Sequence, residues 1–169
     1  MTTLHIATSW DGEAAAPSEV ATVTLHRRPE GLLVGVRAPL HGDPVPPGEG
    51  STWGLWEFEV VELFVLGADE HYTEVELGLH GHFLVLMLEG VRNVVARELP
   101  IPFQVVREGS HWRGEAVVPW SLLPKEPWRG NAYAIHGVGE GRRYLVHHPL
   151  DTSQPDFHAI DQFPTLTVD

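Results

Sequence analysis

The chain has 169 residues, and its apolar fraction of 43% is typical of a single globular domain over residues 1–169. The formal net charge of −12 would repel a nucleic-acid backbone, and the lack of cysteine excludes disulfides, thiolate metal sites and cysteine nucleophiles. No apolar run is long enough to span a bilayer, and no basic and apolar leader is visible. We therefore expect a cytoplasmic protein that binds neither nucleic acid nor membrane.

Short runs rich in valine and aromatic residues begin at the start of the chain. They predict strands at 4–10, 19–26, 32–38, 55–66 and 72–80, separated by turn signals such as Asp11-Gly12 and Pro29-Glu30-Gly31. The segment 39–51 holds four prolines and three glycines and predicts a long surface loop. Loops of this length often lie over a binding site.

Glu62 is the one charged residue in an apolar stripe of the predicted strand 55–66. The stripe consists of Trp56, Phe58, Val60, Glu62, Phe64 and Leu66. A buried carboxylate is costly unless it is paired, hydrogen-bonded or coordinated. Two interpretations stay open: a structural Glu62 tied to an arginine or to backbone amides, or a ligand-facing acceptor whose unpaired carboxyl has a raised pKa.

The predicted strand 72–80 alternates with a period of two. Its apolar face carries Thr73, Val75, Leu77 and Leu79, and its polar face carries Tyr72, Glu74, Glu76 and His80. Side chains two positions apart on a strand are neighbours on one surface, so the polar face is either a solvated sheet face or a surface suited to sugar hydroxyls.

The second half of the chain repeats the pattern of short strands. They are predicted at 83–89, 93–99, 103–107, 112–118, 132–138, 143–147 and 163–168, with one helical turn at 121–123 and a glycine-rich hairpin turn at 137–141. Many short strands without intervening helices predict an all-β fold, a two-sheet antiparallel β-sandwich or jelly roll.

Catalytic and metal motifs are weak in this sequence. There is no nucleophile elbow, phosphate-binding loop or HExxH motif. Glu62 and Glu76 form a conceivable carboxylate pair for glycoside hydrolysis, and His80, His136 or His158 with Glu76 a conceivable metal site, although dispersed histidines are more often surface residues. Among six tryptophans, Trp53 follows the proline-rich loop and is the expected exposed stacking platform.

Several motifs carry a resemblance to known families. The motifs are Trp56-x-x-Glu59-x-x-Glu62, Trp112-x-x-Glu115-x-x-x-Pro119-Trp120, Asn131-Ala-Tyr133 and Phe157-His158. They resemble the family 9 carbohydrate-binding modules of the DOMON-like group. Nearly the whole chain is similar to a family of animal and bacterial proteins whose human member is named for an open reading frame on chromosome 4. Its matching stretches include Leu55–Glu62, Glu74–Leu77, Ala134–Gly137 and Pro155–His158.

The resemblance implies a carbohydrate-binding-module-like sandwich with no assigned activity and no catalytic cofactor, and it allows a structural calcium ion. Some DOMON-like proteins hold haem between methionine and histidine, but Met87 stands within an apolar run that favours core packing. In this sequence His136 replaces an arginine that secreted modules commonly carry.

We therefore expect a non-catalytic module that binds a small polar ligand such as a saccharide. The expected ligand-binding residues are Trp53, Glu62, Tyr72, Glu76, His80, His136, Tyr144 and His158. The alternative is a small hydrolase or metal-dependent enzyme acting on a saccharide on the same scaffold. The sequence does not determine the oligomeric state.

Overall fold

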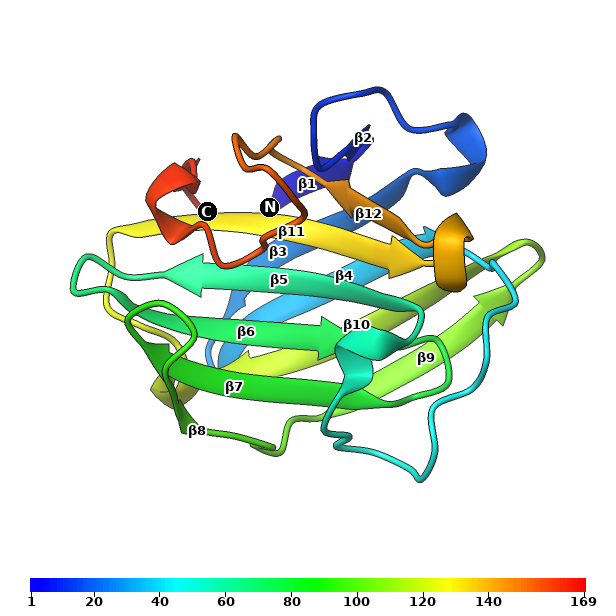
Figure 1. Ribbon diagram of the computed structural model, residues 1–169. Helices are drawn as coiled ribbons and strands as arrows, with labels where there is room; N and C mark the ends of the chain where they lie inside the picture. Colours follow the sequence, from blue (N-terminus) through cyan, green and yellow to red (C-terminus); the bar gives the residue numbers. More distant parts are fainter.

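The structure, a computed structural model, describes residues 1–169 and consists of two packed antiparallel sheets (Figure 1). One sheet has five strands in the order β1 (Thr2–Ile6), β3 (Ala21–Arg28), β4 (Gly31–Pro39), β10 (His111–Pro119) and β9 (Phe103–Glu108). The other sheet has eight strands. Its order is β2 (Thr8–Ser9), β12 (Arg143–Val146), β11 (Trp128–His136), β5 (Val60–Leu66), β6 (His71–Leu77), β7 (Phe83–Glu89) and β8 (Val94–Ala96), with β13 (Thr165–Leu166) paired to β11. The predicted all-β antiparallel sandwich is confirmed.

The main core lies between the two sheets and contains 26 buried residues. Alternate residues of each strand supply it, as a pleated strand requires. On β6 these residues are Val75 and Leu77, as the period-two pattern predicts, and on β11 they are Ala132 and Ala134. Strand alternation therefore sends the other side chains of the eight-stranded sheet to its outer face.

That outer face is also largely buried. A second cluster of 15 buried residues covers it, including Phe64 from β5, Tyr72 from β6, Leu86 from β7 and Tyr133 from β11. The polar face predicted for β6 is consequently not a solvated face.

The segment after β12, residues 147–164, supplies the cover and is called here the covering segment. It is the orange-to-red chain that crosses β11 in Figure 1. Asn131 on β11 fixes its start, because the Asn131 side chain accepts from the His148 backbone N–H and donates to the His148 carbonyl, both at 2.9 Å. Further along, the Tyr133 ring stacks on Phe157 at 3.9 Å and its hydroxyl donates to the Phe157 carbonyl.

Helical structure is limited to five 3₁₀ turns of three residues each: Pro17–Glu19, Leu55–Glu57, Trp120–Leu122, Gly139–Gly141 and Ile160–Gln162. No helix of the molecule has the length and apolar character needed to cross a membrane. The strand predicted at 55–66 is therefore correct only over Val60–Leu66, since Leu55–Glu57 forms a turn. The expected turn near 121–123 and the hairpin turn at 137–141 are confirmed.

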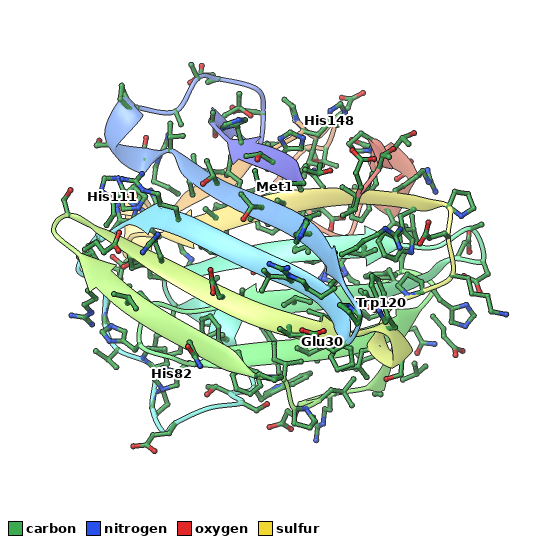
Figure 2. The ribbon with its side chains drawn as sticks, turned by 180° about the vertical axis from the view of Figure 1, so that it is seen from behind. Met1, Glu30, His82, His111, Trp120 and His148 are labelled. Carbon is green, nitrogen blue, oxygen red and sulfur yellow. The ribbon has the colours of Figure 1, made fainter.

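A two-residue turn, Pro29-Glu30, joins β3 to β4. Gly31 is required at the start of β4, because a Cβ atom there would collide with the carbonyl of Val118 on the neighbouring strand. Trp120 lies beside this turn on the far side of the molecule (Figure 2), and its indole N–H donates to the carbonyls of Arg28 and Pro29. These contacts close one end of the sandwich.

Candidate functional site

A cavity of about 610 Å³ opens on the outer face of the eight-stranded sheet. Its volume lies within the range of small-molecule sites. It is bounded by β5, β6, β7 and β11, by the turns around Trp56 and Gly139, and by the covering segment. The lining side chains are Trp53, Trp56, Glu57, Glu62, Phe64, Glu74, Leu86, Leu88, Arg92, Val94, Ile135, Val138, Arg142, Tyr144, Pro155, Phe157 and His158.

Three glutamates, Glu62, Glu74 and Glu76, lie together at the base of this cavity and are called here the carboxyl floor. Glu62 on β5 is directly opposite Glu76 on β6, and Glu74 follows two positions away on the same face. The three residues are only 2%, 4% and 0% exposed. One carboxyl oxygen from each lies within 4.8 Å of the others. Glu62 and Glu74 line the cavity, and Glu76 completes the group beneath it.

The carboxyl floor lacks compensating donors. Both oxygens of Glu76 and Oε2 of Glu74 are buried without a hydrogen-bond partner, and no arginine forms an ion pair with Glu62. Burial raises the pKa of Glu62 and of Glu76 well above the ordinary value, and the neighbouring carboxyl groups raise each further. Burial likewise raises the pKa of Glu74 to about 7. Protonated carboxyls at neutral pH can both donate and accept hydrogen bonds.

Two arginines of the cavity wall act on this floor against the effect of burial: the Arg142 charge lowers the pKa of Glu62, and the Arg92 charge lowers that of Glu74. The Arg142 guanidinium donates to backbone carbonyls, to Gly137 at 3.0 Å and to Trp56 at 2.6 Å, and not to a carboxylate. Gly137, with φ of 82°, adopts a left-handed conformation that favours glycine at the end of β11. This hairpin end therefore anchors Arg142 at the cavity wall.

A hydrogen-bond chain connects β6 to the covering segment. The Arg92 backbone N–H donates to the Tyr72 hydroxyl at 2.9 Å, and that hydroxyl lies 2.7 Å from Nδ1 of His158. Burial, with the Arg92 charge, lowers the pKa of His158 to about 4, so the ring is neutral at pH 7. The hydroxyl accepts from Arg92 and keeps its own proton for Nδ1, an arrangement that assigns the His158 proton to Nε2. Nε2 lies 3.8 Å from Oε2 of Glu74.

Aromatic side chains form the cavity walls. Trp53, 47% exposed, meets Trp56 edge to face at 5.1 Å, and the Arg97 guanidinium lies 4.8 Å from the Trp53 ring. On the other side Tyr144 meets Phe157 edge to face at 6.1 Å. The cavity thus combines carboxyl groups at its base with aromatic and apolar walls.

Six of the eight residues expected to bind ligand gather at this site. Trp53, Glu62, Tyr144 and His158 line the cavity. Glu76 belongs to the carboxyl floor, and Tyr72 lies behind His158 as its hydrogen-bond partner.

The expectation that His80 and His136 join them is not met, because both lie outside the cavity. His80 follows the end of β6 in an exposed turn, where its Nδ1 is 2.7 Å from an Arg107 nitrogen. His136 ends β11 at the position whose side chain alternates away from Tyr133 and Ile135, and it contacts Glu19 at 3.1 Å. The conceivable metal site of histidines with Glu76 is therefore not assembled.

The long loop predicted at 39–51 does not line the cavity. Its His41 ring stacks on His136 at 3.6 Å, and its Gly48 carbonyl lies 2.8 Å from Nε2 of His82. Met87 lies between Leu86 and Leu88 and so points to the sheet face opposite the cavity.

The cavity also contains Trp56, Glu74, Arg142 and Phe157, which are not among the eight residues expected to bind ligand. Of these, Glu74 is already placed on the candidate polar face with Tyr72 and Glu76 by simple alternation. Arg142 and Phe157 carry no such signal, because their approach depends on a hairpin end and on the path of the covering segment.

Comparison with known proteins identifies relatives along nearly the whole chain, although no family model matches. A zebrafish (Danio rerio) UPF0462 protein C4orf33 homolog is 38% identical over 97% of this chain and 88% of its own. The mouse (Mus musculus) homolog is 42% identical, covering 92% and 85%, and the human (Homo sapiens) UPF0462 protein C4orf33 is 39% identical, covering 94% and 84%.

Two solved structures share the fold at low sequence identity. A Bacteroides uniformis protein described as a candidate carbohydrate-binding protein has a TM-score of 0.78 and 16% identity, over all of this chain and 87% of its own. A family 9 carbohydrate-binding module from Caldicellulosiruptor kristjanssonii, in complex with cellotriose, has a TM-score of 0.52 and 13% identity, covering 79% and 68%. The fold is thus carbohydrate-binding-module-like, and by sequence the chain belongs to the UPF0462 (C4orf33) family.

Proposed function

We propose that this protein is a non-catalytic binding module that holds a saccharide or glycoconjugate in the cavity above the carboxyl floor. The observation that carries the proposal is the joint presence of buried carboxyl groups, Glu62 and Glu74, and aromatic walls around one cavity of about 610 Å³. Sugar hydroxyls need polar partners, and the C–H faces of sugar rings pack on aromatic rings.

Each part of the cavity matches one part of such a ligand. The floor carboxyls and the Nε2–H of His158 offer acceptors and donors at the buried base of the cavity, where hydrogen bonds are electrostatically stronger. Trp56 and Tyr144 offer flat apolar surfaces at the sides. The likeness in fold to a module that binds cellotriose supports the same ligand class.

Calorimetric titration with a panel of mono- and oligosaccharides tests the proposal. We expect binding by the wild type and at least roughly tenfold weaker binding by Trp56→Ala, because a stacking surface is lost. His80→Ala is the matched control, since His80 lies outside the cavity, and it should bind like the wild type. No binding by the wild type, or equal losses in both variants, would reject the proposal.

A hydrolase on the same scaffold is the second candidate function. The pKa of Glu74, about 7, suits a general acid in glycoside hydrolysis. Turnover of aryl glycosides by the wild type, abolished in Glu74→Gln, would support it. Saccharide binding without any turnover from roughly pH 5 to 8 would reject it.

A further inference from the structure

Buried carboxyl oxygens of the carboxyl floor receive no hydrogen bond from an N–H group of the protein. Buried polar atoms in folded proteins nearly always have partners, and an exception needs an explanation. Glu76 is 0% exposed, and neither of its carboxyl oxygens has a hydrogen-bond partner. Its neighbours in the floor, Glu62 and Glu74, are further acceptors. Protons shared between the carboxyls, water from the cavity or a bound cation can satisfy this group, and of these the cation alone matches three ionised carboxylates.

We propose that Glu62, Glu74 and Glu76 together bind one hard divalent cation, Ca²⁺ in the first place, at the base of the cavity. Across residues 1–169 they are the one set of three acidic or imidazole side chains whose ligand atoms converge within 4.8 Å. Two oxygens that bind the same Ca²⁺ at roughly 2.4 Å can be at most roughly 4.8 Å apart, so the carboxyls need little movement to share an ion.

The donor set selects the class of cation. All three ligands are carboxylates, and oxygen-only sites suit Ca²⁺, Mg²⁺ or Mn²⁺, whereas Zn²⁺ and Cu²⁺ favour nitrogen and sulfur. The nearest imidazole, that of His158, has its Nδ1 engaged by Tyr72. Three carboxylates offer up to six oxygens, which falls within the coordination numbers of Ca²⁺ and exceeds what Mg²⁺ usually takes from protein groups.

Charge and access favour the same assignment. Three ionised carboxylates and a divalent cation leave one negative charge, and the Arg142 guanidinium at the cavity wall balances it. Glu62 and Glu74 line the cavity while Glu76 lies behind them, so an ion reaches the floor through the cavity and keeps one side toward it. A ligand hydroxyl can take that side, and this last point alone depends on the proposed saccharide function.

Calcium titration of the full chain after treatment with a chelator tests the proposal. We expect one Ca²⁺ per chain by native mass spectrometry and calorimetry, and a higher midpoint of thermal unfolding with added CaCl₂, because a ligand of the folded state stabilises it. MgCl₂ and MnCl₂ are the comparison ions. Binding should release protons, which makes the measured heat depend on the ionisation enthalpy of the buffer.

Matched variants locate the ion. Glu76→Gln should weaken Ca²⁺ binding at least roughly tenfold, since it removes a charged ligand from a buried site. Glu59→Gln should bind like the wild type, because Glu59 is also a buried glutamate (7% exposed) but lies outside the cavity. Glu62→Gln is the second floor variant, in case Glu76→Gln fails to fold.

Two results would overturn the cation site. The first is no Ca²⁺ binding by the wild type, and the second is Ca²⁺ binding that the floor variants retain in full. Either result would mean that the floor holds protons only. A repeat of the saccharide titration separates this outcome from failure of the proposed function. Ca²⁺ binding without saccharide binding rejects the module's proposed ligand, whereas saccharide binding unchanged by chelator and without Ca²⁺ binding rejects the ion.

Discussion

Glu19 and the carboxyl floor are two acidic sites of this molecule with opposite environments. At one end of the sandwich, Glu19 receives hydrogen bonds from Arg143 at 2.8 Å and from the Ala16 backbone N–H at 3.0 Å, and it contacts His136 at 3.1 Å. The Arg143 hydrogen bond is the largest cause of its lowered pKa. In the carboxyl floor no backbone or arginine N–H donates to the carboxyls, and burial raises their pKa values.

Glu59 is intermediate between these extremes. Its Oε1 accepts from the His41 backbone N–H at 3.2 Å, but its Oε2 is buried without a partner. Partly buried Glu19 is fully paired, whereas the three buried glutamates of the floor lack N–H donors beside a cavity, which is the contrast expected between a structural acid and a ligand-binding one. The following predictions test this contrast.

The largest effect is expected from the titration of Glu59. Burial, with the charge of Asp43, raises its pKa to about 7 against the opposing effects of Arg107 and the His41 N–H. Because the folded-state pKa exceeds the unfolded value, wild-type stability relative to Glu59→Gln is highest below the unfolded pKa. It falls by at most roughly 3 kcal/mol as the pH rises toward 7 and is constant above that. Urea unfolding of both proteins from roughly pH 4 to 8 measures this difference in the free energy of unfolding. A difference that does not change with pH would contradict the unpaired state of Oε2.

The next largest effect is expected from Glu19→Gln. It removes the carboxylate that Arg143 and His136 contact and should lower the free energy of unfolding by about 2 kcal/mol at pH 7. Because the folded-state pKa of Glu19 is lowered, its contribution is present above the unfolded value and is lost as the pH falls through the folded value. Urea unfolding at neutral and acid pH measures the loss. A loss that is as large at acid pH would show that packing, not charge, is responsible.

Tyr72→Phe should reduce stability by about 1 to 1.5 kcal/mol, because it leaves the Arg92 N–H and Nδ1 of His158 without a partner. Tyr144→Phe is the control, since the Tyr144 hydroxyl forms no hydrogen bond within the protein, and it should change stability by less than roughly 0.5 kcal/mol. Nitrogen NMR of the His158 ring should show the Nε2–H tautomer in the wild type. A protonated ring at pH 7 would refute the proposed hydrogen-bond chain.

The smallest effect, of opposite sign, is expected from Glu76→Gln in the presence of chelator. An amide in place of an unpaired buried carboxyl should leave stability unchanged or increase it by about 1 kcal/mol at pH 7. Urea unfolding of Glu76→Gln and Glu19→Gln under the same conditions compares their effects on the free energy of unfolding. Destabilisation by Glu76→Gln as large as that by Glu19→Gln would remove the distinction between the two groups.

The fold could be predicted from the sequence because strand alternation is a local property. The alternation of β6 correctly separates Val75 and Leu77 from Glu74 and Glu76, and Glu62 is conspicuous as a charge in an apolar stripe. The pairing of Glu62 with Glu76 is not local, since it depends on the register between β5 and β6.

The burial of the predicted polar face could not be predicted from strand alternation. It depends on the covering segment, more than sixty residues later in the chain, and period-two alternation carries no information on what packs over a sheet. His136 illustrates the same limit of local patterns. Its residue type suits a binding site, but its position on β11 directs the side chain away from Tyr133 and thus from the cavity.

The covering segment shapes the upper part of the cavity, whereas the two-sheet core carries the strands below it. The roof of the cavity rests on a few connections, including the Arg92–Asp156 ion pair at 2.7 Å and the stacking of Tyr133 on Phe157. The two-sheet core contains none of these roof residues. Substitutions in this short stretch of chain would therefore reshape the upper part of the cavity without changing any residue of the two-sheet core.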